Sequence, residues 1–377
     1  MNPTIEALFI GPTLIVSLLI FANFGKVNVK ANRWFGIFVL CIFVIQLGVL
    51  YDKTNTPAKN SSVNDVINLT NYIIAPVFYF SIIYYVEFNR KWRWRDNLHF
   101  LFGGLMLLLT ILSFFVPRSP LKTLDEKNME AETVFIFNVI FSLQVLIYCL
   151  VAYYKIAKYQ KNLLIYSSNT YKINLRWLKK IVVCVVLIAV LWLVDGVFQI
   201  SEDSFVFDYA STLLYFIGIC YIAYHALQQK EIFLFNTEEK QQLDAIIEEA
   251  EREVETKKKL ISDEKLAEHV QGLKKMMDAQ KPHLDYEISL IRLAEQFKTS
   301  PHQLSYIINT GFGENFFQFI NRYRVDEAKW MILDPKMNHL SLVGICYEAG
   351  FNSKTVFNTT FKKITGQTPT EFKKSHN

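Results

Sequence analysis

Side chains with the types and spacing that catalysis or metal binding needs are scarce in this sequence. Its five cysteines form no CxxC pair, and none lies near histidines at the spacing of zinc ligands. Four of them lie inside apolar runs: Cys41, Cys149, Cys184 and Cys220. Cys346 stands alone near the C-terminus. We therefore expect no metal, no cofactor and no disulfide scaffold.

Two ionisable residues, Asp195 and His269, are the remaining candidates for chemistry. Asp195 lies within an apolar run, where a carboxylate is costly without a partner and marks a candidate functional site. It is the candidate for signal sensing, and a helix–helix hydrogen bond is the alternative role. His269, in "AEHVQG", invites comparison with a histidine-kinase phosphoacceptor, but no acidic residue stands directly after it and no Gly-rich nucleotide-binding region follows. We expect a solvated helix residue there, and no enzyme.

The elements that must position these residues begin with seven apolar stretches. A helix needs about 20 residues to cross a hydrocarbon core of about 30 Å, and each stretch is close to that length. Their approximate ranges are Ala7–Phe24, Phe35–Tyr51, Ile67–Phe88, Leu98–Val116, Thr133–Tyr154, Ile181–Ile200 and Phe205–Leu227. The sequence therefore predicts a seven-helix transmembrane sensor domain over residues 1–227.

The basic residues between these stretches predict their orientation. The first, third and fifth connections contain three, four and seven Lys or Arg, and the second, fourth and sixth contain two, three and none. Basic connections stay in the cytoplasm, so the N-terminus is expected outside and the C-terminus inside. Four tryptophans flank the basic side, as interfacial aromatic residues do: Trp34, Trp92, Trp94 and Trp177. We expect a multi-pass membrane protein with its C-terminal region in the cytoplasm.

Residues 228–281 read as a charged helical linker, or stalk, with a joint near Ser262. One narrow apolar stripe consists of Leu243, Ile247, Ala250 and Val254. A second consists of Leu266, Val270, Leu273 and Met277. Such stripes suit a two-stranded coiled coil, so a homodimer through residues 237–281 is expected, with a single solvated helix as the alternative.

Residues 282–377 change to short amphipathic helices with two helix-turn-helix patterns, at 288–309 and 341–364. In the first, "ISLIRLAEQF" is followed by a turn at Lys298 and by "SPHQ", a capping box in which Ser300 caps the next helix and Gln303 reaches back. In the second, Gly350 supplies a left-handed turn after "SLVGICYEAG", and Ser353 caps the following helix. A longer helix, "NFFQFINRYRVDEAKWMIL", joins them, and "TPTE" caps a last helix. The whole chain is expected to be all-α.

These residues resemble the DNA-binding domain of AraC/XylS transcription regulators. The similarity rests on "INRYRVDEAK" (Ile320–Lys329) and on the long signature GF.S...F...FKK..G.TP..F from Gly350 to Phe372. Cys346, where that family usually has alanine, departs from the pattern. The membrane half resembles seven-span members of this family only in its layout, which implies a protein of the bacterial cytoplasmic (inner) membrane.

The resemblance implies that two recognition helices enter successive major grooves of duplex DNA. Its outward positions, carried over to this sequence, give candidates for base readout: His302, Ser305, Tyr306, Lys354, Thr355, Asn358 and Thr359. Asn358 could pair with adenine, and Lys354 with guanine or phosphate. Candidates for phosphate contact are Lys362, Lys363, Lys373 and Lys374. The 11 basic and nine acidic residues of Pro282–Asn377 give only a small positive charge, but five lysines and one acid follow from Lys354 onward.

The sequence thus predicts a membrane-bound one-component transcription regulator, with double-stranded DNA as its partner and RNA polymerase as a further possible partner. The alternative is a membrane signalling protein or transporter whose helical tail binds a protein instead of DNA. Footprinting of DNA by the C-terminal domain distinguishes the two.

Overall fold

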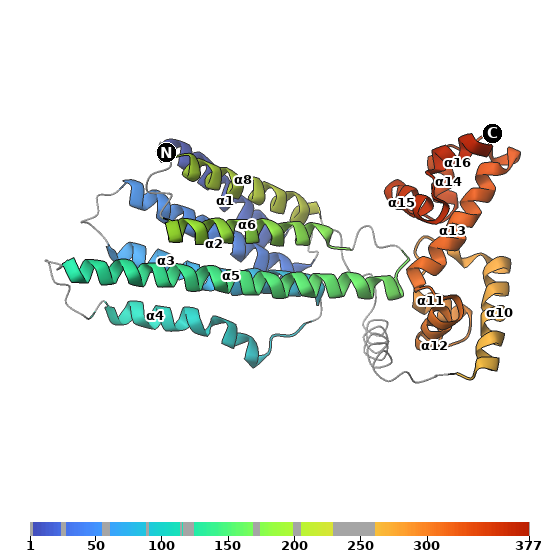
Figure 1. Cartoon of the computed structure of the whole chain (residues 1–377), viewed down its shortest axis with the longest axis horizontal. Helices are drawn as coiled ribbons and strands as arrows, with labels where there is room; N and C mark the ends of the chain where they lie inside the picture. Colours follow the sequence, from blue (N-terminus) through green and yellow to red (C-terminus); the bar gives the residue numbers. More distant parts are fainter. Residues whose placement is uncertain are drawn as a thin grey trace. The chain divides into compact units, whose positions relative to one another are not determined.

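A computed structural model describes residues 3–23, 28–54, 61–87, 90–113, 115, 124–168, 174–198, 205–228 and 261–376. The chain divides into two compact units, which we describe one at a time (Figure 1). The first contains Met1–Ala157 and Leu175–Ile232, and the second contains Lys158–Asn174 and Phe233–Asn377. The regular secondary structure of the described residues is helical apart from one isolated β-bridge, which confirms the predicted all-α class.

The first unit is built from long apolar helices. They are α1 (Pro3–Ala22), α2 (Val29–Thr54), α3 (Ser61–Val86), the 3-10 helix η1 (Trp94–Phe100) continued by α4 (Leu101–Ser113), α5 (Leu124–Tyr166), α6 (Arg176–Phe198) and α8 (Phe205–Gln228). Five segments of the described residues are long and apolar enough to cross a membrane: Val29–Tyr51, Val66–Val86, Trp94–Leu112, Asn138–Tyr166 and Arg176–Val194. Leu8–Ala22 and Leu213–Ala226 are shorter apolar helices. Five spans are therefore supported by length and composition, and the count of seven stays a prediction.

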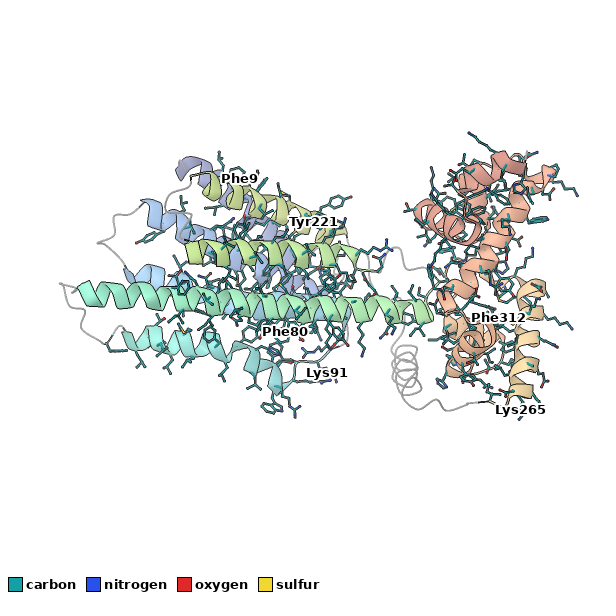
Figure 2. All side chains as sticks on the ribbon, in the orientation of Figure 1. Phe9, Phe80, Lys91, Tyr221, Lys265 and Phe312 are labelled. Carbon is teal, nitrogen blue, oxygen red and sulfur yellow. The ribbon has the colours of Figure 1, made fainter. Side chains whose placement is uncertain are left out.

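Ion pairs and aromatic stacking gather near the residues that the basic-loop count assigns to the cytoplasmic side. Arg90 pairs with Asp96 at 2.5 Å, and Lys155 of α5 pairs with Glu87 at 2.9 Å. Trp34 of α2 stacks on Trp92 with 5.6 Å between the ring centroids. Figure 2 shows how densely side chains fill the spaces around Phe80 in this unit. These contacts hold α2, α3 and α5 together at the end where the basic loops lie.

Helix α5 is much longer than its predicted span, Thr133–Tyr154. It continues to Tyr166, past Lys155, Lys158 and Lys161. The prediction ended where the hydropathy falls, but lysines favour helix in water, so the helix need not end there. The division between the two units falls inside α5, after Ala157.

The second unit contains the short helices of the C-terminal region. They are α10 (Asp263–Gln280), η2 (Pro282–Leu284), α11 (Leu290–Gln296), α12 (Pro301–Tyr306) continued by the π-helical turn η3 (Ile307–Gly311), α13 (Phe316–Leu333), η4 (Pro335–Met337), α14 (Leu342–Glu348), α15 (Lys354–Thr365) and α16 (Pro369–His376). The two helix-turn-helix pairs form where the sequence predicts them, as α11–α12 and α14–α15. Helix α13 joins the pairs.

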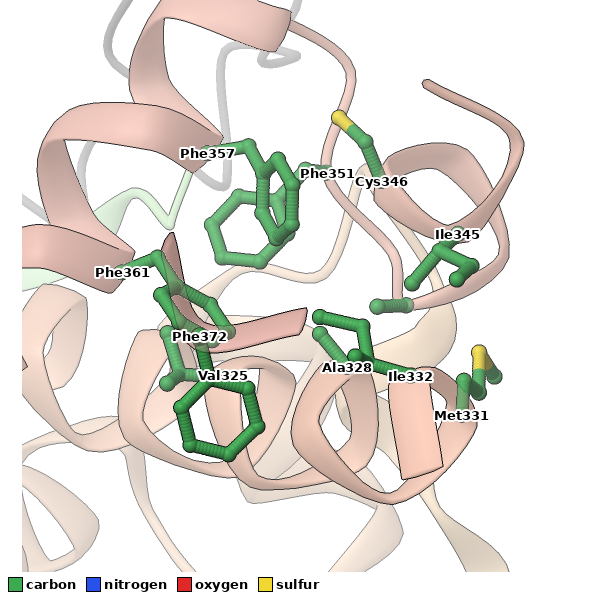
Figure 3. Close-up of a cluster of buried hydrophobic side chains, with 11 residues drawn as sticks. Val325, Ala328, Met331, Ile332, Ile345, Cys346, Phe351, Phe357, Phe361 and Phe372 are labelled. Atoms are coloured by element: carbon green, nitrogen blue, oxygen red, sulfur yellow. The ribbon is translucent and has the colours of Figure 1, made fainter. Parts of the chain in front are cut away.

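Helix α13 contributes buried residues to both pairs. Its N-terminal half buries Phe319 and Ile320, and Leu304 and Ile307 of the first pair are also fully buried. Its C-terminal half buries Val325, Ala328, Met331 and Ile332 in one cluster with side chains of α14, α15 and α16 (Figure 3). In that cluster the ring centroid of Phe361 lies 5.6 Å from that of Phe357 and 5.4 Å from that of Phe372. Both pairs are therefore packed on one helix.

Part of the apolar stripe of α10 packs within the chain, whereas Leu266 and Val270 stay partly exposed. Leu273 and Met277 are fully buried. A Cβ atom built on Gly311 of η3 would overlap Val270, and one built on Gly272 would contact Phe297 of the first pair at 3.6 Å. The first helix pair therefore covers part of this stripe, and a homodimer through residues 237–281 stays a prediction. The other predicted stripe, Leu243 to Val254, lies outside the described residues.

Candidate nucleic-acid interface

A serine caps the N-terminus of each of the four helices in the two pairs. Such caps are favoured because the first N–H groups of a helix lack intrahelical acceptors. Ser300 Oγ accepts from the backbone N–H of Gln303 at 3.1 Å, with Pro301 in the first helical position. Ser341 Oγ accepts from Gly344 N–H at 3.1 Å. Ser353 Oγ accepts from Val356 N–H at 3.5 Å. Ser289 caps α11, which the sequence analysis missed although a serine before "LIRLA" is the usual signal.

The capping box predicted at "SPHQ" is only half formed. The side-chain oxygen of Gln303 accepts from the hydroxyl of Thr299 at 2.9 Å rather than from the backbone N–H of Ser300. The neighbouring threonine hydroxyl supplies a competing donor. The box predicted at "TPTE" is complete, because Thr368 N–H donates to Glu371 at 2.8 Å and Glu371 N–H donates to Thr368 at 3.3 Å.

The first recognition helix, α12 with η3, presents two of its three predicted readout residues. His302 and Tyr306 are partly exposed. Ser305 is only 7% exposed, and its hydroxyl accepts from the side-chain amide of Asn309 at 3.4 Å. The outward orientation expected of Ser305 is therefore wrong, because the residue lies on the same side as its buried neighbour Leu304. Contact between His302 or Tyr306 and DNA stays a prediction.

The second recognition helix, α15, is shaped by the turn before it. Gly350 has φ +85°, as predicted for a left-handed turn, and Ser353 ends the turn. Lys354 and Thr355 are exposed in the first turn of α15, and Asn358 is partly exposed one turn later. Thr359 is exposed, but its hydroxyl donates to the backbone oxygen of Thr355 at 2.7 Å. Its methyl group and the lone pairs of its hydroxyl oxygen are therefore the parts left for contact with a base.

The lysines predicted to contact phosphate lie on α15 and α16. Lys362, Lys363 and Lys374 are exposed, and Lys373 is partly exposed. Within the described residues none of the four forms an ion pair. Nearby Glu371 is held by Thr368, which lowers the pKa of its carboxyl group through backbone and side-chain hydrogen bonds. The lysine charges therefore stay available for an anionic partner.

A buried arginine, which the sequence analysis did not single out, links the segment before α11 to the turn of the second pair. Arg324 of α13 is 2% exposed, and its Nε and Nη2 donate to the carbonyl oxygens of His283 and Asp285 at 2.7 and 2.8 Å. Its guanidinium also lies 5.8 Å from the ring of Phe351, beside the Gly350 turn. Burial lowers the pKa of Arg324 to about 10, so it stays charged at neutral pH. Its spacing from Ile320 and Ala328 in the apolar stripe was the available signal.

His283 lies beside this arginine. It is 3% exposed, and neither ring nitrogen has a hydrogen-bond partner among the described residues. Burial lowers the pKa of His283 to about 4; Arg324 and Lys281 lower it further, and Glu327 opposes them. The ring is therefore neutral at pH 7.

The remaining candidates are Asp195, the cysteines and a metal site. The side chain of Asp195 lies outside the described residues, so its role stays a prediction. All five cysteines are free, and the described residues contain no group of three or more His, Cys, Asp or Glu side chains that could hold a metal ion.

Comparison with known proteins supports the helix-turn-helix assignment. A family described as "Helix-turn-helix domain" matches residues 293–375. An uncharacterized HTH-type transcriptional regulator of Staphylococcus aureus strain COL is 32% identical over 91 residues, which are 24% of this chain and 12% of that protein. A second such regulator of Staphylococcus aureus is 33% identical with the same coverage. The chain thus matches about an eighth of the length of these relatives. No solved structure matches it.

Proposed function

We propose that this chain is a membrane-bound one-component transcription regulator. Its C-terminal unit binds a specific sequence of duplex DNA, and its apolar helices keep the protein in the bacterial cytoplasmic membrane with that unit in the cytoplasm. The observation that carries the proposal is the pair of recognition helices, α12 and α15, on one connecting helix. The similarity to HTH-type transcriptional regulators supports it.

The exposed polar residues of these two helices perform the readout in this proposal. Asn358 pairs through its amide with adenine, whose major-groove edge offers one donor and one acceptor. Lys354 contacts guanine or phosphate, and His302 and Tyr306 serve the neighbouring groove. Lys362, Lys363, Lys373 and Lys374 contact phosphate and fix the register of the protein on the duplex.

In this proposal the membrane half senses a signal, and Asp195 is the residue that responds to it. Two copies joined through the stalk would bring two C-terminal units to one operator, and linked sites bind more tightly than separate ones. The seam for such a dimer lies within residues 237–281. RNA polymerase is the further partner that a DNA-bound regulator would contact.

The test uses the full-length chain in detergent micelles and a pool of random DNA duplexes. Rounds of selection yield the preferred sequence, and footprinting locates it. Asn358→Ala should then relax preference at one base pair, by about 1–3 kcal/mol of lost discrimination. Lys362→Gln is the matched control, because loss of a phosphate contact weakens binding to all sequences alike. Selection that enriches no sequence would refute the proposal.

The sensing part has its own test. Asp195→Asn should change how a reporter gene responds in cells, while the purified variant binds the selected duplex with unchanged affinity. An unaltered response would return Asp195 to a packing role.

A further inference from the structure

The two residues that follow α5 belong to the C-terminal unit and contact it through buried polar groups. Ser167 forms an antiparallel β-bridge with Ser289, the cap of α11. The hydroxyl of Ser168 donates to the carbonyl oxygen of Ile288 at 2.8 Å. Ser167, Ser168 and Ser289 are 9%, 1% and 7% exposed. Residues 167 and 168 are therefore attached to the backbone just before α11, where the first helix pair begins.

The same two residues reach the connecting helix. Nη2 of Arg324 donates to the hydroxyl of Ser168 at 3.3 Å, and the side-chain amide of Asn321 donates to the backbone oxygen of Ser168 at 3.5 Å. Arg324 and Asn321 are both on α13 and almost fully buried. Within the described residues, the guanidinium of Arg324 donates to two carbonyl oxygens and this one hydroxyl. Loss of a partner is costly for a buried charge, so the contact is energetically coupled to the position of α13.

The C-terminal end of α5 has one buried face and one exposed face. Tyr159, Leu163 and Tyr166 recur at four- and three-residue spacing, which puts them on one face of the helix. They are 6%, 1% and 4% exposed. Because α5 is continuous from Leu124 to Tyr166, this face is covalently linked to the predicted fifth membrane span without a break in the helix.

We infer that residues 158–168 are a docking segment through which the membrane half regulates the DNA-binding unit. The segment touches the cap of α11 and the middle of α13, the two elements that orient α12 and α15, and it leaves the exposed readout residues uncovered. Docking therefore preorganises the recognition helices, and a signal that displaces α5 weakens DNA binding. This inference rests on the proposed function of the C-terminal unit.

A cross-link tests the docking itself in the full-length chain in native membranes. Residues facing each other across an antiparallel bridge have Cα atoms about 4.5–5.5 Å apart, within the range that a disulfide spans. Ser167→Cys with Ser289→Cys should form a disulfide on mild oxidation, detected by mass spectrometry of the joined peptides. The matched control is Ser167→Cys with Ser341→Cys, because Ser341 caps α14 as Ser289 caps α11. Cys184 and Cys220, which are not buried, are replaced by serine in both. No cross-link, or an equal one in the control, would overturn the docking.

The DNA affinity of the cross-linked protein tests the regulation. The oxidised Ser167→Cys, Ser289→Cys protein should bind a duplex selected by the parent chain at least fivefold more tightly than the same protein after reduction, the lower end of ordinary allosteric coupling. Oxidation should leave the affinity of the control pair unchanged. A cross-link that leaves the affinity unaltered would show that the contact is only structural and would overturn the regulation. A cross-link in a protein for which no duplex can be selected would instead refute the proposed DNA-binding function.

Discussion

Replacing Gly350 with alanine should destabilise the second helix pair more than any other glycine-to-alanine change in the described C-terminal unit. Its φ of +85° costs an L-residue about 1–2 kcal/mol. The added Cβ would also overlap the carbonyl oxygen of His283 and lie 2.9 Å from Cα and O of Leu284. These neighbours are backbone atoms, so a whole segment must move, at about 1–3 kcal/mol. The expected loss is therefore about 2–5 kcal/mol.

Two other glycines separate the two causes. Gly366, after α15, has φ +80° but no atom within 4 Å of a built Cβ, so Gly366→Ala should cost only the conformational part, about 1–2 kcal/mol. Gly344 lies inside α14, has no positive φ, and meets nothing closer than 3.5 Å. Gly344→Ala should stabilise the helix by about 0.5–1 kcal/mol.

Hydrogen exchange, followed by mass spectrometry of the full-length chain in detergent micelles, measures these differences where they occur. Under native conditions the exchange rate of protected amides in α14 and α15 reports the free energy of local opening. At a tenfold change in rate for every 1.4 kcal/mol, Gly350→Ala should speed exchange about 30-fold to 4,000-fold. If Gly350→Ala exchanges no faster than Gly366→Ala, the overlap with His283 and Leu284 does not constrain the turn, and the reasoning is refuted.

Three further predictions concern charge and capping. Because burial depresses the pKa of His283 to about 4 from an ordinary 6.5, the unfolded chain binds a proton more readily between these values. The free energy of unfolding should therefore be highest above pH 6.5 and fall by about 3 kcal/mol as the pH drops toward 4. In urea unfolding, the His283→Gln variant should lack this part of the pH dependence. Ser353→Ala should cost about 0.5–2 kcal/mol, seen as faster exchange in α15 with α11 unchanged. Lys363→Gln should reduce the slope of log affinity against log salt by about 0.9, whereas Lys329→Gln, which removes a lysine already paired with Asp326, should leave it unaltered. An equal change in both lysine variants would mean that Lys363 does not meet a phosphate.

The features that were predictable from the sequence depend on neighbours along the chain. Ser300 and Ser353 cap helices, and Gly350 turns the chain, because each satisfies backbone groups or torsions within a few residues. The seven apolar stretches became helices for the same reason, since hydropathy and helix length are local properties. Local patterns also suffice to locate both helix-turn-helix pairs and the exposed face of α15.

The features that were missed depend on residues far apart in the sequence. Nothing around Arg324 says that its donors end on His283, Asp285 and Ser168, the last of which is 156 residues away. The stripe of α10 has the spacing of a coiled coil, and only the tertiary fold reveals that η3 and Phe297 cover part of it. Ser305 illustrates a smaller error: its outward position was carried over from the resemblance, and its side chain is only 7% exposed.

In the proposed regulator, the sequence of α13 limits how the two recognition helices can fit different operators. Over its 18 residues it contains neither glycine nor proline, the residues at which helices most often kink. The spacing and angle between the two recognition helices are therefore set by a stiff rod anchored in both cores. An operator whose grooves are presented at another angle has to bend or twist to meet them, and that deformation typically costs DNA about 1–6 kcal/mol. Base pairs that no side chain touches would then influence affinity through their flexibility.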